Sequence, residues 1–187
     1  DFHTCVTAEG IGLDIDDKHK QIIGKPFPED LTETTLSGYY AAGGSGDKKL
    51  VYRTDVINSY PEYPLFDGER YVGLGYKYQL IDQSYKLLTI NTPLAIVEYQ
   101  IDGSSMNMYR QYWNNPNGFM FMRCNDMKYC RGFKRKFESC IHFISHAIRA
   151  KKMNAISTSP LPFLTLLAII PGICLFCYNW LMLKCRK

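Results

Sequence analysis

Short stretches in which apolar and polar positions alternate recur along most of the chain. The clearest runs from Val72 to Leu80, where Val, Leu and Tyr alternate with Gly, Lys and Gln. A period of two places one set of side chains on the buried face of a strand. Further short apolar runs, separated by turn residues, occupy 36–42, 49–57, 85–90, 94–101, 106–113 and 119–124. These runs predict a mainly β fold, an antiparallel meander of about seven short strands forming a sandwich or barrel.

A helical period is present between residues 131 and 152. Apolar residues recur there at spacings of three and four, namely Phe133, Phe137, Cys140, Ile141, Ile144 and Ile148. The opposite face carries charged residues together with His142 and His146, which we expect to face solvent. We expect the apolar stripe to pack against the sheet. The alternative is an amphipathic helix that lies flat on a membrane with its apolar side down.

The strongest apolar signal is the segment 163–183, which contains no charged residue. As a helix it would be about 31 Å long, which matches the roughly 30 Å hydrocarbon core of a bilayer. Tyr178 and Trp180 stand near one end, where aromatic rings favour the membrane interface. The segment therefore predicts a single transmembrane helix, kinked at Pro171, after a short linker at 153–162 and before a basic tail at 184–187.

Residues 1–152 form one β-rich domain in this interpretation, with the helix 131–152 at its end. The chain begins at Asp1 rather than Met, as after removal of a signal peptide, and this predicts a domain outside the cytosol. Basic residues near Lys152 outnumber those of the tail, and the positive-inside rule would reverse the orientation. We favour a domain at the cell surface or in the secretory pathway, because whole domains translocate largely regardless of charge.

The seven cysteines divide between the domain and the C-terminal segment. The domain contains Cys5, Cys124, Cys130 and Cys140, and an even number in an exported domain predicts two disulfides. We expect Cys5 to pair with one of the other three and the remaining two to pair with each other. Free thiols in a reducing cytosol are the alternative. Cys185, beside the apolar segment and among basic residues, is a candidate for lipidation.

The sequence lacks the residue patterns of catalysis and cofactor binding. The pair His142 and His146 has no metalloprotease glutamate, so we expect no metal site. The acidic run at 14–17 lacks the glycine and closing glutamate of a calcium loop. We therefore expect neither an enzyme nor a cofactor. The net charge of +4 is modest, and the basic residues gather close to the apolar segment, which argues against a nucleic-acid partner.

A small domain on a single anchor with a short tail is typical of a recognition protein, so we expect it to bind another protein at the membrane surface, outside the cytosol. Tyrosine and tryptophan suit such a surface because their rings offer contact area at low entropic cost. The candidate partner-binding residues are Tyr39, Tyr40, Tyr60, Tyr63 and Trp113.

Two other functions remain open from the sequence. The domain would be a membrane-tethered carrier or sensor of an apolar ligand if the meander closed as a barrel. Its cavity would then be lined by Met106, Met108, Phe119 and Phe121. The chain would instead be a structural subunit of a larger membrane complex if its C-terminal helix packed laterally against other membrane helices.

Overall fold

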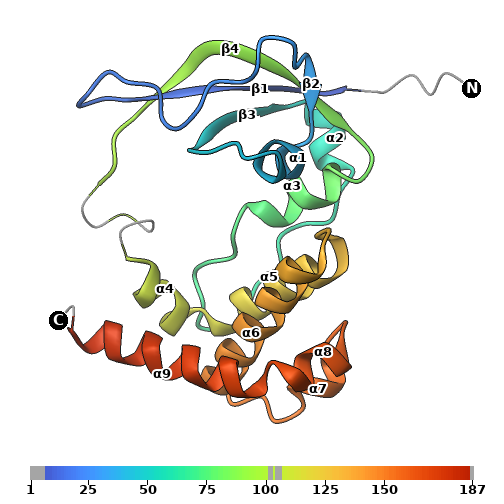
Figure 1. The fold of residues 1–187 in the computed structure, drawn as a ribbon, viewed down its shortest axis with the longest axis vertical. Helices are drawn as coiled ribbons and strands as arrows, with labels where there is room; N and C mark the ends of the chain where they lie inside the picture. Colours follow the sequence, from blue (N-terminus) through green and yellow to red (C-terminus); the bar gives the residue numbers. More distant parts are fainter. Residues whose placement is uncertain (1–6, 101–102, 104–106, 186–187) are drawn as a thin grey trace, which may run out of the picture. The chain divides into compact units, whose positions relative to one another are not determined.

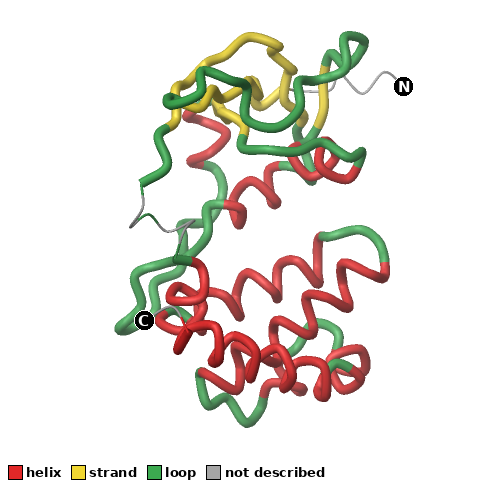
Figure 2. Tube along the Cα trace, turned by 60° about the vertical axis from the view of Figure 1, so that its left-hand side comes forward, coloured by secondary structure: helices red, strands yellow, loops and turns green. Residues whose placement is uncertain are grey.

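The computed structural model describes residues 7–100, 103 and 107–185. Contacts within the chain divide it into two compact units (Figure 1). The N-terminal unit comprises Asp1–Glu62 and Lys77–Gln100, and the C-terminal unit comprises Tyr63–Tyr76 and Ile101–Lys187. The strands belong to the N-terminal unit, and the described part of the C-terminal unit is built from helices (Figure 2). The protein is therefore mixed α and β, and the predicted mainly β fold is wrong.

Four strands form one mixed sheet in the N-terminal unit. They are β1 (Thr7–Asp16), β2 (Glu33–Thr34), β3 (Lys48–Tyr52) and β4 (Lys86–Val97). Their order across the sheet is β2-β4-β1-β3. β1 pairs in parallel with β4 and antiparallel with β3, and β2 pairs antiparallel with β4. The parallel pair at the centre excludes the predicted meander, because parallel strands need a crossover connection rather than a tight turn.

Three short helices pack on one face of this sheet: α1 (Leu36–Ala41), α2 (Thr54–Asn58) and α3 (Gly75–Ile81). Ile11 and Leu13 point from β1 toward the helices, because alternate residues of a strand share a face. They form a core with Phe27, Tyr39, Val56, Ile81 and Leu87. Residues from all three helices therefore close over the sheet from one side.

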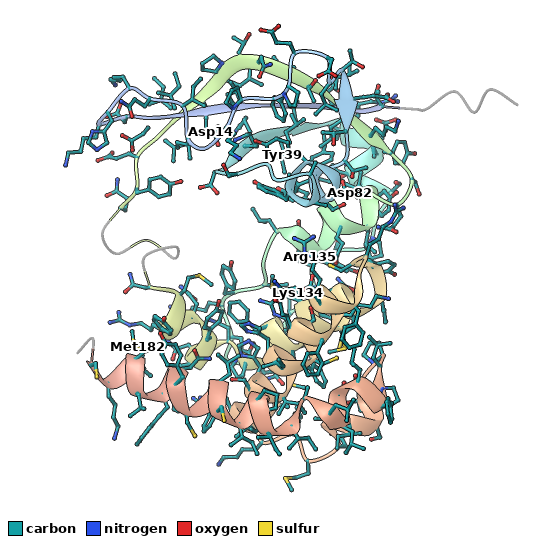
Figure 3. The ribbon with its side chains drawn as sticks, in the orientation of Figure 1. Asp14, Tyr39, Asp82, Lys134, Arg135 and Met182 are labelled. Atoms are coloured by element: carbon teal, nitrogen blue, oxygen red, sulfur yellow. The ribbon has the colours of Figure 1, made fainter. Side chains whose placement is uncertain are left out.

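The start of α1 is held by a carboxylate far away in the sequence. Asp82 accepts hydrogen bonds from the backbone N–H groups of Leu36 (3.1 Å) and Ser37 (2.7 Å). A helix N-terminus leaves such donors open, so the carboxylate acts as a cap. Tyr39 and Asp82 both lie on the helix-covered side of the sheet (Figure 3). The run predicted as a strand at 36–42 is therefore a helix.

The described part of the C-terminal unit consists of six helices: α4 (Met108–Asn114), α5 (Pro116–Tyr129), α6 (Phe133–Arg149), α7 (Ala155–Thr158), α8 (Pro162–Leu167) and α9 (Ile169–Cys185). α6 packs between α5 and α9. Its apolar stripe contributes to a core made of Met127, Cys140, Phe143, Ile144, Ala147, Ala155 and Ala168. A helix within 131–152 is confirmed, whereas its predicted packing against a sheet is wrong because other helices cover the stripe.

Further predicted strands are helical in the structure. Residues 72–80 overlap α3, the described part of 106–113 overlaps α4, and 119–124 lie inside α5. A short apolar run fits a buried strand or a buried helix equally well, so packing decides between them. In α5 the local signal is Pro116, which occupies the first turn, where its missing N–H is not needed. Pro116 therefore marks the start of α5.

Within the described ranges, no helix is long and apolar enough to cross a membrane, so the predicted transmembrane helix at 163–183 is wrong. The apolar segment is interrupted at Ala168, whose backbone (φ −83°, ψ −1°) ends α8. Pro171 explains the interruption, because it has no N–H for the carbonyl of Leu167 and its ring collides with that carbonyl. The 17 residues of α9 extend about 25 Å, short of the roughly 30 Å of a bilayer core.

The predicted disulfides are also contradicted in the part of the chain that the structure describes. Cys124, Cys130 and Cys140 are thiols, and Cys5 lies outside the described residues. Burial raises the pKa of the Cys124 and Cys140 thiols. Cys130 Sγ donates to the carboxylate of Asp126 at 3.7 Å. These cysteines therefore serve as small side chains in helix packing.

Candidate functional site

Large apolar side chains of α8 and α9 are exposed. The two helices follow one another in the C-terminal unit (Figure 1). We name this surface the α8–α9 apolar face; its members are Phe163, Leu166, Leu167, Ile170, Ile173, Trp180 and Leu181. Phe163 is 73% exposed and Ile170 is 75% exposed. A single exposed apolar residue is ordinary, whereas a contiguous group marks a binding surface.

The inner side of the same helices carries small or polar residues. Thr165 and Ala168 are fully buried, and Gly172 is buried against α6. A Cβ atom added at Gly172 would stand 2.6 Å from the Ile144 side chain. The small residues therefore allow α9 to approach α6 closely. Since the small residues take the inner positions, the large apolar residues are left on the outer side.

We expect Gly172→Ala to destabilise the C-terminal unit by about 1–3 kcal/mol, because the new methyl group would overlap Ile144. Gly75→Ala is the matched control, since a Cβ at Gly75 would meet no atom within 4 Å. Thermal unfolding followed by circular dichroism measures both variants. Equal melting temperatures for the two would contradict the close approach of α9 to α6.

Aromatic and basic side chains accompany the α8–α9 apolar face. Near the end of α9, Lys184 Nζ lies 3.9 Å from the centre of the Trp180 ring, and Tyr178 is half exposed. Lys151 and Lys152 are exposed shortly before α7, which packs on α8. Apolar surface bordered by aromatic rings and lysines is typical of helices that lie at a membrane interface.

The last part of the chain contains no acidic residue. After Glu138 there is no Asp or Glu, and the basic residues are Arg149, Lys151, Lys152, Lys184, Arg186 and Lys187. Arg149 is engaged inside the unit, where its Nε donates to the carbonyl of Trp113 at 2.9 Å and its guanidinium lies over the Trp113 ring. Lys151, Lys152 and Lys184 are exposed. The exposed charge of this part of the chain is therefore positive.

A second group of polar residues lies inside the C-terminal unit. His146 is 2% exposed, and its ring lies 5.3 Å from Tyr112 and 5.2 Å from Phe119, measured between centroids. Burial, reinforced by the positive charge of Arg123, lowers the pKa of His146 to about 3 and that of His142 to about 4. The expectation that both histidines face solvent is therefore wrong.

The buried histidines have unused hydrogen-bonding atoms. His142 Nδ1 and His146 Nε2 are buried without a hydrogen-bond partner among the described residues. Among the residues that the structure describes, no group of three or more His, Cys, Asp or Glu could hold a metal ion. Both rings are neutral at neutral pH, because their pKa values lie well below 7. We therefore expect the pair to make the C-terminal unit sensitive to acid.

The five predicted partner-binding residues are divided between the two units. Tyr39 is buried and its hydroxyl donates to the carbonyl of Lys25 at 2.8 Å, while the Tyr40 hydroxyl donates to Gly46 at 2.8 Å. Tyr60 packs against the same core. In the C-terminal unit, the Tyr63 hydroxyl donates to Leu74 at 3.1 Å, and the Trp113 ring stacks on Phe176 at 6.0 Å. These contacts are structural, and partner binding by the five residues stays a prediction.

Two further sequence-based expectations can be located. Cys185 is exposed at the end of α9, and its lipidation stays a prediction. Of the residues proposed to line a ligand cavity, Met106 lies outside the described residues. Phe119 is 2% exposed, and its ring contacts Tyr71 and Tyr112 as well as His146. The ring is therefore used in packing within the unit.

Comparison of the chain with known protein families, with curated proteins and with solved structures finds no match.

The transmembrane interpretation of the apolar segment 163–183 overlooked one signal. Small or polar residues recur within it at positions 165, 168, 172 and 179, at spacings of three, four and seven. Such a stripe places small side chains on one side of a helix, where a neighbouring helix can pack closely. Thr165, Ala168, Gly172 and Asn179 are all buried in the structure. The stripe therefore distinguishes the covered side of α8 and α9 from the open one.

Proposed function

We propose that this protein docks on the surface of a lipid bilayer through the α8–α9 apolar face. The observation that carries the proposal is that large apolar residues of α9 are exposed, while α6 covers its side of small residues. A group of exposed apolar residues on one element is typical of a surface that binds an apolar partner. The exposed side of α9 therefore requires an apolar partner.

The residues around this face favour lipid over another protein. No charged residue occurs from Met153 to Leu183, whereas protein interfaces usually have a polar rim that forms hydrogen bonds. Trp180, Tyr178 and Lys184 together suit the boundary between acyl chains and headgroups. Fully burying a large apolar side chain contributes about 1.5–3 kcal/mol, so the half-exposed residues of the face are sufficient for reversible attachment.

Docking on a bilayer is compatible with the recognition role expected from the sequence. A protein partner outside the cytosol, bound by another part of the chain, stays a prediction. The same holds for the alternatives of an apolar-ligand carrier and of a subunit in a larger complex. Attachment through α8 and α9 is compatible with each of them, because none of the five candidate partner-binding residues belongs to the α8–α9 apolar face.

Flotation of the full chain with phosphatidylcholine vesicles, with and without anionic lipid, tests the docking function. We expect the unaltered protein to float with vesicles. Ile170→Glu is expected to lower its partition coefficient at least about tenfold, because the change removes an apolar side chain and places a charge in the interface. Ile170 is 75% exposed, so the substitution leaves the packing of the unit intact.

Leu65→Glu is the matched control for this substitution. Leu65 is 96% exposed and belongs to the C-terminal unit but not to the α8–α9 apolar face. The Leu65→Glu substitution introduces the same charge in place of an exposed apolar residue, and we expect the variant to float with vesicles as the unaltered protein does. Equal losses for Leu65→Glu and Ile170→Glu would refute docking through this face. A protein that stays off all vesicles and forms dimers sensitive to Ile170→Glu would show that the face binds a second copy of the chain.

A further inference from the structure

We infer that the α8–α9 apolar face selects bilayers with anionic headgroups, an inference that rests on the proposed docking function. The apolar side chains of the face have no preference among headgroups. Selection has to come from charges that reach the headgroup layer when the apolar residues enter the interface. Three exposed lysines of this part of the chain can supply such charges: Lys184 in α9, and Lys151 and Lys152 between α6 and α7.

Lys184 is held at the α9 end by an aromatic ring of the face itself. Its ammonium lies 3.9 Å from the centre of the Trp180 ring. Trp180 is 39% exposed, so ring and ammonium reach the surface together. Since tryptophan prefers the level of the headgroups, this contact places the positive charge where lipid phosphates lie.

Lys151 and Lys152 provide two further exposed charges. Both lie between α6 and α7, and Lys152 stands three residues before α7. Three residues extend at most about 10 Å, so Lys152 stays close to α7, which packs on α8. Met153, the next residue, is 98% exposed and adds apolar surface beside them. Exposed apolar surface therefore lies beside these lysines as well.

No negative charge from the same stretch of sequence opposes these lysines. The chain contains no Asp or Glu after Glu138. Glu138 itself lies in the second turn of α6, with its carboxylate 4.0 Å from Lys134. An anionic surface would therefore meet these lysines and no repelling carboxylate of α7, α8 or α9. This charge complementarity identifies the favoured bilayer as an anionic one.

The size of the preference follows from the number of lysines. A lysine near an anionic bilayer contributes about a fivefold gain in partition, so three contribute about a hundredfold. The gain falls as salt is added, because the interaction acts over a Debye length of about 10 Å at 0.1 M. Apolar docking does not weaken with salt in this way. The charge contribution is therefore separable from the apolar contribution in one experiment.

The experiment measures partition of the full chain into vesicles of phosphatidylcholine alone and of phosphatidylcholine mixed with phosphatidylglycerol. We expect binding to be about a hundredfold tighter on the mixed vesicles at low salt. The triple variant Lys151→Gln, Lys152→Gln, Lys184→Gln is expected to lose this preference. It should still bind phosphatidylcholine vesicles as the unaltered protein does, because the apolar face is unchanged.

A second triple variant controls for net charge: Lys128→Gln, Lys134→Gln, Arg135→Gln. These residues are exposed near the α5–α6 connection. Lys134 is about 22 Å along α6 from Arg149, and Figure 3 shows Lys134 and Arg135 on the side of the C-terminal unit away from α9. The control is expected to keep the anionic preference. Equal binding of the unaltered protein to both vesicle types, or equal losses in both triple variants, would overturn the inference and leave docking standing. Binding to neither vesicle type would overturn docking itself.

Discussion

Acidification from neutral pH to about pH 4 is expected to unfold the C-terminal unit. Burial lowers the pKa of His146 to about 3 and of His142 to about 4, below the ordinary 6.5. Above about pH 6.5 neither the folded nor the unfolded state is protonated at these rings, and their contribution to stability is complete. Below it, the unfolded state binds protons that the folded state excludes. Each histidine then lowers the free energy of unfolding by up to about 1.4 kcal/mol for each pH unit.

The expected loss of stability is large compared with the free energy of unfolding of a typical domain, which is about 5–15 kcal/mol. Denaturant unfolding of the full chain, followed by circular dichroism at a series of pH values, measures it. The groups facing the pair are Arg123, which opposes protonation, and Glu138 and Asp126, which favour it at His142. Stability is expected to fall as the pH decreases from the ordinary histidine pKa toward the two lowered pKa values.

A double variant isolates the contribution of the two rings. His142→Gln with His146→Phe removes both titrating groups and keeps an aromatic ring between Tyr112 and Phe119. We expect the fall in stability between about pH 6.5 and pH 4 to become much shallower. His19→Gln is the control, because His19 is exposed in the N-terminal unit. A double variant with the pH dependence of the unaltered protein would show that other groups cause the acid sensitivity.

Ile144→Asp is expected to destabilise the C-terminal unit by about 4 kcal/mol or more. Ile144 is 5% exposed and lies in the core that α6 shares with its neighbours. It is also the side chain against which Gly172 of α9 packs. A carboxylate there would lose its hydration without gaining a partner, which is among the most costly of single substitutions. The melting temperature of the full chain and its far-ultraviolet helix signal measure the effect.

Ile148→Asp provides the matched comparison on the same helix. Ile148 is one turn further along α6 and is 37% exposed, so an aspartate at this position stays hydrated. We expect a loss of about 1 kcal/mol or less. Similar losses at positions 144 and 148 would mean that α6 is not enclosed as the structure shows. A loss confined to position 144 would confirm the packing of α6 against α9.

The hydrophobic periodicity predicted the secondary structure correctly where it extended over many residues. The stripe from Phe133 to Ile148 predicted a helix, and α6 spans Phe133–Arg149. Shorter runs were ambiguous, because four to eight apolar residues suit a buried strand and a buried helix equally. The run Val72–Leu80 has strand alternation, yet Gly75–Ile81 is helical in the structure. In that helix Ile81 contributes to a core with residues that are distant in the sequence.

The sequence identified the apolar segment that contains the α8–α9 apolar face but wrongly predicted it to be a transmembrane helix. The absence of charge from Met153 to Leu183 identified the apolar segment. Whether such a segment spans a membrane or packs on one side depends on its partner helices. The close approach of Gly172 to Ile144 on α6 shows that one side is already occupied. The same contact left the large apolar residues of the α8–α9 apolar face exposed.

The sequence by itself determined the local properties of this protein: a long amphipathic helix, an apolar C-terminal segment that contains Pro171, and the absence of acidic residues after Glu138. Only the tertiary structure decided how distant residues complete these elements. Asp82 caps α1, and Glu69 accepts hydrogen bonds from the N–H groups of Asn117 and Gly118 at the start of α5, both at 2.8 Å. Partners separated by more than forty positions leave no local pattern, because hydrogen-bond satisfaction and burial depend on which surfaces meet in space.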